Sequence, residues 1–352
     1  MEHDAVTVIS RMAEQGHPQV SHFYDRATGL RAIIAVHSNA LGPGVGGVRI
    51  RDYDDEAAAL TDVLRLSEAM SYKAACAGLN CGGAKAVVLG PFPSDRRAGM
   101  HALGRAVDSL GGRYVATEDM GMTESDIAWL NEVTPHAVGR SLADGGSGDP
   151  SPHTADGVIV GMRAALQAAR MGDDVRGLKV AVQGCGHVGL AVIERLLAGG
   201  AEVLASDIRA DAAARAEQAG ARVVDNDVIL TQAVDVISPC GIGAILDQRT
   251  IAALRCRVVA GAANNQLATE RDGIRLNERG IVYAPDFVIN AGGLINVSDE
   301  LDPNGYDAAR VARRIAAIET TLTQLFAEAV AQNSTTDMAA VAMARSRIGA
   351  NH

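Results

Sequence analysis

The chain has 352 residues, of which 48% are hydrophobic, and its 42 acidic and 32 basic side chains give a formal net charge of −10. A chain of this length is too long for one ordinary core and suits two domains. The negative charge argues against nucleic acid or an anionic membrane surface as a partner. No stretch approaches 18 uninterrupted apolar residues, so we expect no segment that spans a membrane.

The cysteines and the first ten residues bear on the cellular compartment. The five cysteines are odd in number and form no CxxC pair, which favours free thiols in a reducing compartment and argues against a zinc site. We therefore expect no bound metal. The N-terminal sequence MEHDAVTVIS has an acidic start and no apolar core, so it predicts no signal peptide and a cytoplasmic protein.

The first part of the chain alternates strand-like and helix-like segments. Short apolar runs predict strands, and apolar residues at helical spacing predict helices. The expected strands are 31–37, 86–89 and 113–117, and the expected helices are 54–70, 97–110 and 125–132.

A run rich in Gly, Pro, Ser and Asp, SLADGGSGDPSP at residues 141–152, predicts a linker. We expect Thr154 to cap a helix over 157–170 that enters the next domain. The predicted division of the chain is 1–145 for the first domain, 146–332 for the second, and 333–352 for a C-terminal helix that packs back on the first domain.

Residues 178–207, LKVAVQGCGHVGLAVIERLLAGGAEVLASD, combine a buried strand, a glycine-rich turn, a helix and a second strand. This order predicts a βαβ unit that binds a dinucleotide, with the pyrophosphate at the helix N-terminus. A purely structural crossover is the alternative. In the predicted loop, one glycine allows the tight turn, one lets the backbone approach the pyrophosphate and one lets helix and strand pack closely. The loop residues expected at the cofactor are Gly184, Cys185, Gly186, His187, Val188 and Gly189.

Asp207 ends the second strand, 18 residues after Gly189, and is placed to accept hydrogen bonds from the adenosine ribose hydroxyls. Its charge would repel a 2′-phosphate, which favours NAD over NADP as the cofactor. Arg209 could pair with that phosphate, although we favour its interpretation as a solvated arginine at the start of a helix.

Apolar runs after this unit predict further strands, with helices between several of them. The pattern is typical of a doubly wound, largely parallel Rossmann-type sheet. The fold class is therefore α/β with two domains. The expected strands are 222–224, 234–238, 258–260 and 281–283, and the expected C-terminal helices begin at Asp307, break at 333–336 and resume over 338–347.

The first domain carries a second group of residues that points to chemistry. Lys73 lies near a helix end in MSYKAA, Lys85 in the glycine-rich turn GLNCGGAKAV before a strand, and Asp119 in TEDMG after the next strand. Two partly buried ammonium groups would lower each other's pKa, so one could bind a carboxylate while the other acts as a base. Alternatively, the lysines are exposed loop charges and Asp119 precedes a helix as a cap.

Longer segments between roughly residues 41 and 300 read LGPGVGGVR, DVLRLSEAMSYKAACAGLNCGGAK, GSGDPSPHTADGV, VAVQGCGHVG, VAGAANNQL and YAPDFVINAGGLINVSDE. They resemble the leucine/phenylalanine/valine branch of the NAD-dependent amino-acid dehydrogenases, whose distant relatives are the glutamate dehydrogenases. The chain departs from the family pattern at Ala84, where a third glycine is usual, and in GCGHVG, where GxGNVA is common. The resemblance implies an N-terminal substrate-binding and oligomerisation domain, a Rossmann domain, and a cleft between them.

The resemblance also implies residue roles. Lys73 would pair with the substrate α-carboxylate, Lys85 would activate the water that attacks the imine carbon, and Asp119 would exchange protons with the amino group. Asn265 would contact the substrate and the nicotinamide ribose, and Thr154 the nicotinamide carboxamide. The further substrate-binding residues are Gly46, Gly47, Val45, Thr117, Leu294 and Val297, and the loop under the cofactor holds Ser238 and Cys240.

The implied reaction is the reversible oxidative deamination of an L-amino acid, in which NAD⁺ and water yield the 2-oxo acid, ammonium and NADH. The expected side-chain pocket holds no acid or base, so an apolar substrate follows. Thr117 stands where leucine-preferring relatives tend to have alanine and phenylalanine-preferring ones glycine, so we expect branched-chain substrates to be favoured. The alternative is the same reaction on aromatic amino acids, of the phenylalanine or tryptophan type.

Two other functions fit parts of the sequence. A different Rossmann oxidoreductase would need a His–Arg catalytic pair, but His136, His153 and His187 have no evident arginine partner in such a motif. A non-catalytic NAD-binding relative would be expected to have lost a lysine or the aspartate. The resemblance finally implies a homo-oligomer, at least a dimer, whose other partners are its small-molecule substrates.

Overall fold

The computed structural model describes residues 7–350, apart from the side chain of Glu124. Contacts divide the chain into two compact units, which are described separately. The first comprises residues up to Asp149 together with 297–307 and 344–350, and the second comprises 150–296 and 308–343. The first six residues of the segment that predicts no signal peptide lie outside the described residues.

Two segments depart from the predicted division of the chain. Residues 297–307 belong to the first unit, where the Glu300 carboxylate accepts a hydrogen bond of 2.7 Å from the backbone N–H of Ser147. Of the predicted C-terminal segment 333–352, residues 333–343 belong to the second unit, whereas residues 344–350 belong to the first unit, where Arg347 donates a hydrogen bond to the Ala75 carbonyl oxygen. Both assignments depend on contacts between residues far apart in sequence, which local patterns cannot reveal.

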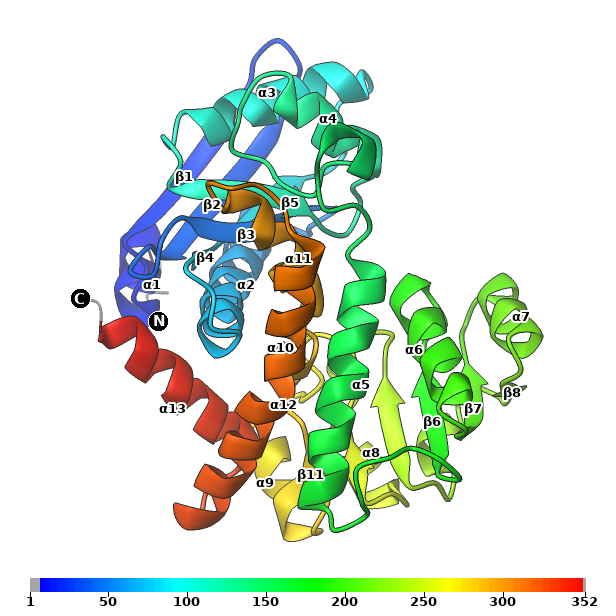
Figure 1. Ribbon diagram of the computed structural model, residues 1–352. Coiled ribbons are helices and arrows are strands. Elements are labelled where there is room, and N and C mark those ends of the chain that lie inside the picture. Colours follow the sequence, from blue (N-terminus) through cyan, green and yellow to red (C-terminus); the bar gives the residue numbers. More distant parts are fainter. Residues whose placement is uncertain (1–6, 351–352) are drawn as a thin grey trace, which may run out of the picture. The chain divides into compact units, whose positions relative to one another are not determined.

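The first unit is built on a five-stranded mixed sheet of order β1-β2-β4-β3-β5 (Figure 1). β2 is antiparallel to β1 and β4, whereas β3 is parallel to β4 and β5. The sequence did not predict α1, β1 or β3. The elements are α1 Val8–Gln15, β1 Gln19–Tyr24, β2 Arg31–Ser38, β3 Gly44–Arg51, α2 Glu56–Cys76, β4 Gly82–Leu89, α3 Arg96–Asp108, β5 Tyr114–Glu118, α4 Glu124–Asn131, and the short helices Leu142–Asp144 and Asp299–Leu301.

Different helices cover the two faces of this sheet. Alternate residues of β2 and β4, such as Ile34 and Ala86, join α3 and α4 in one buried cluster. The intervening residues, such as Ile33 and Val87, pack with α2 in another. Because successive side chains of a strand point to opposite faces, Lys85 lies on the face that α2 covers.

The glycine-rich stretches of the first unit are strands. The sequence predicts a glycine-rich loop at residues 41–47 and a turn at Lys85, but residues 44–47 lie in β3 and Lys85 lies in β4. Glycine is required here for close packing: a Cβ added to Gly83 would lie 2.0 Å from the backbone nitrogen of Ser71 in α2. A glycine run suggests a turn when only local sequence is considered, whereas this contact exists only in the tertiary structure.

The second unit confirms the predicted doubly wound fold. Its six strands are all parallel, in the order β11-β10-β9-β6-β7-β8 (Figure 1). Ile237 and Val259 pack with α8 and α9 on one face, and Val180 and Val258 are also fully buried. The elements are α5 Ser151–Ala168, β6 Lys179–Gln183, α6 His187–Ala198, β7 Glu202–Ser206, α7 Ala210–Gln218, β8 Arg222–Val223, the short helix Ile229–Thr231, β9 Val236–Pro239, α8 Gln248–Ala253, β10 Val258–Val259, α9 Glu270–Glu278, β11 Val282–Tyr283, α10 Asp286–Ile289, α11 Gly292–Ser298, α12 Ala308–Ala331 and α13 Thr336–Gly349.

The sequence predicts that Thr154 caps a helix, but in the structure it does not. Helix α5 begins at Ser151, so Thr154 lies in its first turn and donates a 3.1 Å hydrogen bond to the Pro150 carbonyl oxygen. The linker-like composition of residues 141–152 does not indicate where α5 begins, because Pro152 suits the first turn of a helix as well as a loop.

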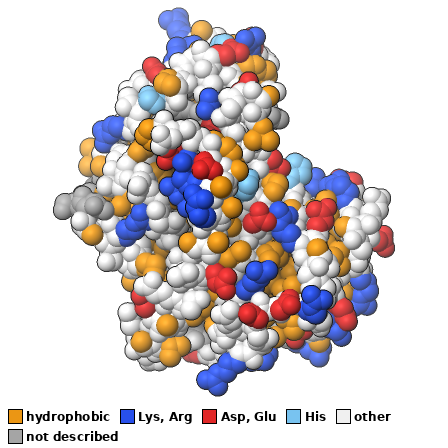
Figure 2. Space-filling view, viewed as in Figure 1, with side chains coloured by type: hydrophobic (Ala, Val, Ile, Leu, Met, Phe, Trp, Pro, Cys, Tyr) orange, Lys and Arg blue, Asp and Glu red, His pale blue; other side chains and the backbone are white. Residues whose placement is uncertain are grey.

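No helix between residues 7 and 350 combines the length and apolar character needed to cross a membrane. On the face shown in Figure 2, acidic and basic side chains are interspersed. The five cysteines are free thiols. Within the described part of the chain, no group of three His, Cys, Asp or Glu side chains could hold a metal ion.

Candidate active site

A buried ion pair lies at the centre of the first unit's site. The Lys85 side chain is only 6% exposed, and its Nζ lies 2.6 Å from Oδ2 of Asp119. Lys85 is therefore no exposed loop charge. Asp119 is no helix cap either, because Thr123 occupies the N-cap of α4.

A second cation, which the sequence analysis missed, contacts the same carboxylate. Arg49 Nε donates a 3.2 Å hydrogen bond to Oδ2 of Asp119. Burial by itself would raise the pKa of Asp119, but the Lys85 ammonium and the Arg49 guanidinium outweigh it and lower the pKa to about 2. The spacing of Arg49 in the sequence could have identified it. Arg49 follows Gly47 by two residues and therefore lies on the same face of β3.

Two glycines of β3 lie next to this pair, and Gly47 makes room for it. A Cβ added to Gly47 would lie 2.6 Å from the Asp119 Cβ and 3.0 Å from the Lys85 Nζ. The buried Tyr114 hydroxyl donates a 2.9 Å hydrogen bond to the Gly46 carbonyl oxygen and so fixes the strand beside them. A side chain at position 47 would displace the ion pair.

Lys73 lies in the last turn of α2 and is half-buried. The contact of Ser71 with Gly83 brings this helix end against the strand that carries Lys85. The chain contains three lysines in all, at positions 73, 85 and 179, although arginine is abundant. Because arginine does not deprotonate in proteins, lysine is the only one of these two cationic residue types that can act as a base, and two of the three lysines lie here.

Three of the four expected pocket residues lie in the first unit. Thr117 and Val297 flank Gly139, because a Cβ added to Gly139 would lie 3.4 Å from the Thr117 Oγ1 and 3.8 Å from a Val297 methyl. Val45 is fully buried in β3. Leu294 belongs to the second unit, where it is also buried.

The glycine loop of the second unit has the geometry of a dinucleotide cradle. Gly184 has φ +94°, a value that favours glycine. A Cβ added to Gly189 would lie 1.9 Å from the Gly184 carbonyl oxygen, whereas one added to Gly186 would meet nothing within 4 Å. Helix α6 begins directly after Gly186, with His187 and Val188 in its first turn. The space before this N-terminus is open, so the residues fit a pyrophosphate.

Asp207 organises this loop from the end of β7. Its Oδ2 accepts a 2.7 Å hydrogen bond from the Cys185 backbone N–H, and its Oδ1 accepts one of 2.8 Å from that of Arg209. Carboxylate oxygens can accept more than one hydrogen bond each, so capacity remains for ribose hydroxyls. The Arg209 side chain is 56% exposed, with Nε 3.8 Å from Asp207.

The other expected cofactor residues also lie in the second unit. Ser238 is the second-last residue of β9, which neighbours β6 at the point where the strand order reverses. Such sheets bind ligands at this position. Cys240 follows, and its backbone N–H donates a 2.7 Å hydrogen bond to the Gln183 carbonyl oxygen at the end of β6. Asn265 has a left-handed backbone, with φ +52°.

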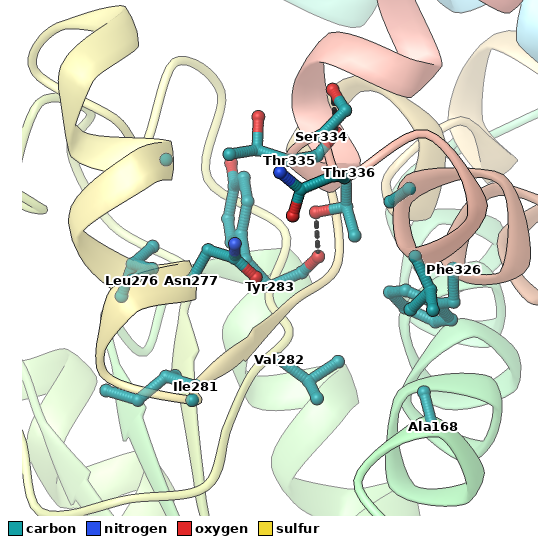
Figure 3. Close-up of a pocket in the computed structure, with 15 residues that line it drawn as sticks. Ala168, Leu276, Asn277, Ile281, Val282, Tyr283, Phe326, Ser334, Thr335 and Thr336 are labelled. Carbon is teal, nitrogen blue, oxygen red and sulfur yellow. Dashed lines mark hydrogen bonds between the residues drawn. The ribbon is translucent and has the colours of Figure 1, made fainter.

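A pocket of about 350 Å³ in the second unit lies apart from all of these residues (Figure 3). It is lined by parts of α9, β11, α12 and the start of α13, and includes Phe326 and Tyr283. The Thr336 hydroxyl donates a 2.6 Å hydrogen bond to the Tyr283 carbonyl oxygen at its edge. None of the expected site residues lines this pocket.

Comparison with known proteins identifies the family of the chain. Residues 17–136 match the Glu/Leu/Phe/Val dehydrogenase dimerisation domain, and residues 145–213 and 207–351 match the Glutamate/Leucine/Phenylalanine/Valine dehydrogenase domain. The leucine dehydrogenase of Thermoactinomyces intermedius is 43% identical over 343 residues, which cover 97% of this chain and 93% of that protein. The leucine dehydrogenase of Bacillus subtilis (strain 168) is 45% identical over 309 residues, which cover 87% and 84%.

Solved structures agree with the fold. The crystal structure of L-tryptophan dehydrogenase from Nostoc punctiforme superposes with a TM-score of 0.84 at 38% identity, covering 97% of this chain and 99% of that one. Amino-acid dehydrogenases of this family use nicotinamide cofactors. The chain therefore belongs to the Glu/Leu/Phe/Val dehydrogenase family, in the branch of the leucine and phenylalanine enzymes, and is an amino-acid dehydrogenase that acts on a CH–NH2 group.

Proposed function

We propose that the chain catalyses the reversible, NAD-dependent oxidative deamination of a branched-chain L-amino acid. The observation that carries the proposal is the buried Lys85–Asp119 pair beside Gly47, since the 2.6 Å separation lets a proton pass between a base and a carboxylate. Relatives named leucine dehydrogenase, at 42–45% identity, support this substrate class.

Each group of the first unit has a task in this reaction. The Lys73 ammonium binds the substrate α-carboxylate, which fixes the Cα for oxidation. Bound NAD⁺ would supply the acceptor for the Cα hydride. Asp119 takes the proton that leaves the substrate amino group, and Lys85 takes one from the water that attacks the imine carbon. The Lys85–Asp119 contact lets these two protons be exchanged within one hydrogen-bonded pair.

The pocket supports an apolar substrate. Val45, Thr117, Leu294 and Val297 offer no charge to pair with an acidic or basic side chain. The Thr117 side chain occupies space beside Gly139 that a larger substrate would need. Aromatic substrates are the second candidate, because relatives named L-tryptophan dehydrogenase and phenylalanine dehydrogenase are 40% identical.

The second unit offers the groups for NAD. The open space before Gly186 suits the pyrophosphate, and the Asp207 carboxylate suits unphosphorylated ribose hydroxyls. Thr154, Ser238, Cys240 and Asn265 would complete the site. The match of residues 17–136 to a dimerisation domain supports a homo-oligomer, at least a dimer. Free thiols support a cytoplasmic location.

A spectrophotometric screen tests the proposal. The purified chain is mixed with NAD⁺ and single L-amino acids, and NADH formation is followed. We expect valine, leucine and isoleucine to react with a higher kcat/KM than phenylalanine. The absence of NADH formation with every L-amino acid would overturn the reaction, whereas faster turnover of phenylalanine or tryptophan would overturn only the substrate preference.

A further inference from the structure

We propose that Arg49 is a positioning residue that keeps Asp119 ionised in the free enzyme when Lys85 is neutral, so that the carboxylate can take the proton of the substrate amino group. The inference rests on the proposed roles of Lys85 and Asp119. It assigns a fourth charged residue to the reaction, after Lys73, Lys85 and Asp119, and this residue acts through the Asp119 carboxylate.

Two cations contact one oxygen of the Asp119 carboxylate. Oδ2 of Asp119 is 2.6 Å from the Lys85 Nζ on β4 and 3.2 Å from the Arg49 Nε on β3. The other charged or titratable groups on the neighbouring elements are Arg51 on β3, Glu56, Asp62, Arg65, Glu68, Tyr72, Lys73 and Cys76 on α2, and Tyr114 and Glu118 on β5. Two cations contact Asp119, and the reaction requires only Lys85 to change its protonation state. Arg49 keeps its charge throughout.

Arg49 is itself held in place from the far side. Its Nη1 donates a 3.1 Å hydrogen bond to Oδ2 of Asp62 on α2, and the Tyr53 hydroxyl donates one of 2.9 Å to the same oxygen. Burial and the neighbouring Asp62 raise the pKa of Tyr53, so the phenol remains a donor. A guanidinium donates from two nitrogens in fixed directions, and here it bridges two carboxylates.

The positive charge of Arg49 affects the protonation of Asp119. When Lys85 is neutral, its contribution to the stability of the Asp119 carboxylate is lost, and the buried acid would tend to capture the proton itself. The permanently charged Arg49 guanidinium opposes this capture. Without Arg49, protonation of the Lys85–Asp119 pair becomes easier, and the pair titrates at higher pH.

The test is the pH dependence of kcat/KM for the preferred amino acid, measured for the wild type and three variants. For Arg49→Gln we expect the acid limb of the deamination profile to move up by about 1 pH unit, the scale on which a nearby opposite charge acts on a carboxyl group. The difference in kcat/KM between Arg49→Gln and the wild type should become smaller at high pH, where the Lys85–Asp119 pair is deprotonated in both proteins. Arg49→Lys keeps the charge but not the bridge, and should recover most of the pH shift.

Arg65→Gln is the matched control. Arg65 donates a 3.1 Å hydrogen bond to Asp62 but its side chain is 56% exposed and does not contact Asp119, so the limb should stay in place. The thermal unfolding midpoint, compared with that of the wild type, reports whether each variant is folded. An Arg49→Gln enzyme with an unmoved acid limb and a rate loss constant across pH would overturn the inference. A wild type that deaminates no amino acid would instead overturn the proposed function.

Discussion

The two units position their functional residues in different ways. The cofactor loop of the second unit lies within 30 consecutive residues, and its glycines are required by a left-handed turn and a helix–strand contact. The site of the first unit draws on β3, β4, β5 and α2, and its glycines lie in extended strands. A motif that is contiguous can be recognised in sequence, whereas a site assembled across a sheet requires the strand order as well.

If the two units can be altered independently, we expect the largest loss of activity when Lys85, the proposed base, is removed. We expect Lys85→Ala to lower the deamination rate by 10²–10⁴-fold, roughly what a general base contributes, while NADH affinity stays unchanged. Steady-state rates and NADH titration check this in parallel. Lys179→Ala is the matched control, because Lys179 is the remaining lysine and its side chain is exposed in the second unit. A Lys85→Ala enzyme with more than about a tenth of the wild-type activity would remove Lys85 from the role of base.

A smaller effect should come from the cofactor loop. We expect kcat/KM with NAD⁺ to exceed that with NADP⁺ by at least about tenfold, because the Asp207 carboxylate would repel a 2′-phosphate. Initial rates at a fixed amino-acid concentration, with each cofactor varied, measure the ratio. Comparable efficiencies would implicate Arg209, and Arg209→Gln would then be expected to restore the preference for NAD⁺.

The smallest effect concerns the side-chain pocket. Thr117→Gly should raise kcat/KM for phenylalanine relative to valine, since it removes the side chain that lies beside Gly139. A change of this size in a pocket alters discrimination by about 1–3 kcal/mol. Thr117→Val is the control, because it keeps the volume and removes only the hydroxyl. A wild type that already prefers aromatic substrates would show that Thr117 does not limit the pocket.

Sequence patterns succeeded where structure is local. They predicted the strand, helix and second strand of residues 178–207, which the structure confirms. They failed where a residue's environment comes from distant segments. The sequence predicts a loop at Gly44 and a turn at Gly83, but both residues lie in strands. It assigns no role to Arg49, because nothing near Arg49 in sequence indicates the Asp119 carboxylate that it contacts.

The sequence by itself determined the fold class, the family and the residue types available for catalysis, because these follow from periodicity and from contiguous motifs. Only the tertiary structure decided that Lys85 is buried against Asp119, that Arg49 joins them, and that residues 297–307 return to the first unit. The physical reason is that burial and ion pairing are set by segments that the fold brings together, and a partner 34 or 70 positions away leaves no periodic signal in the chain.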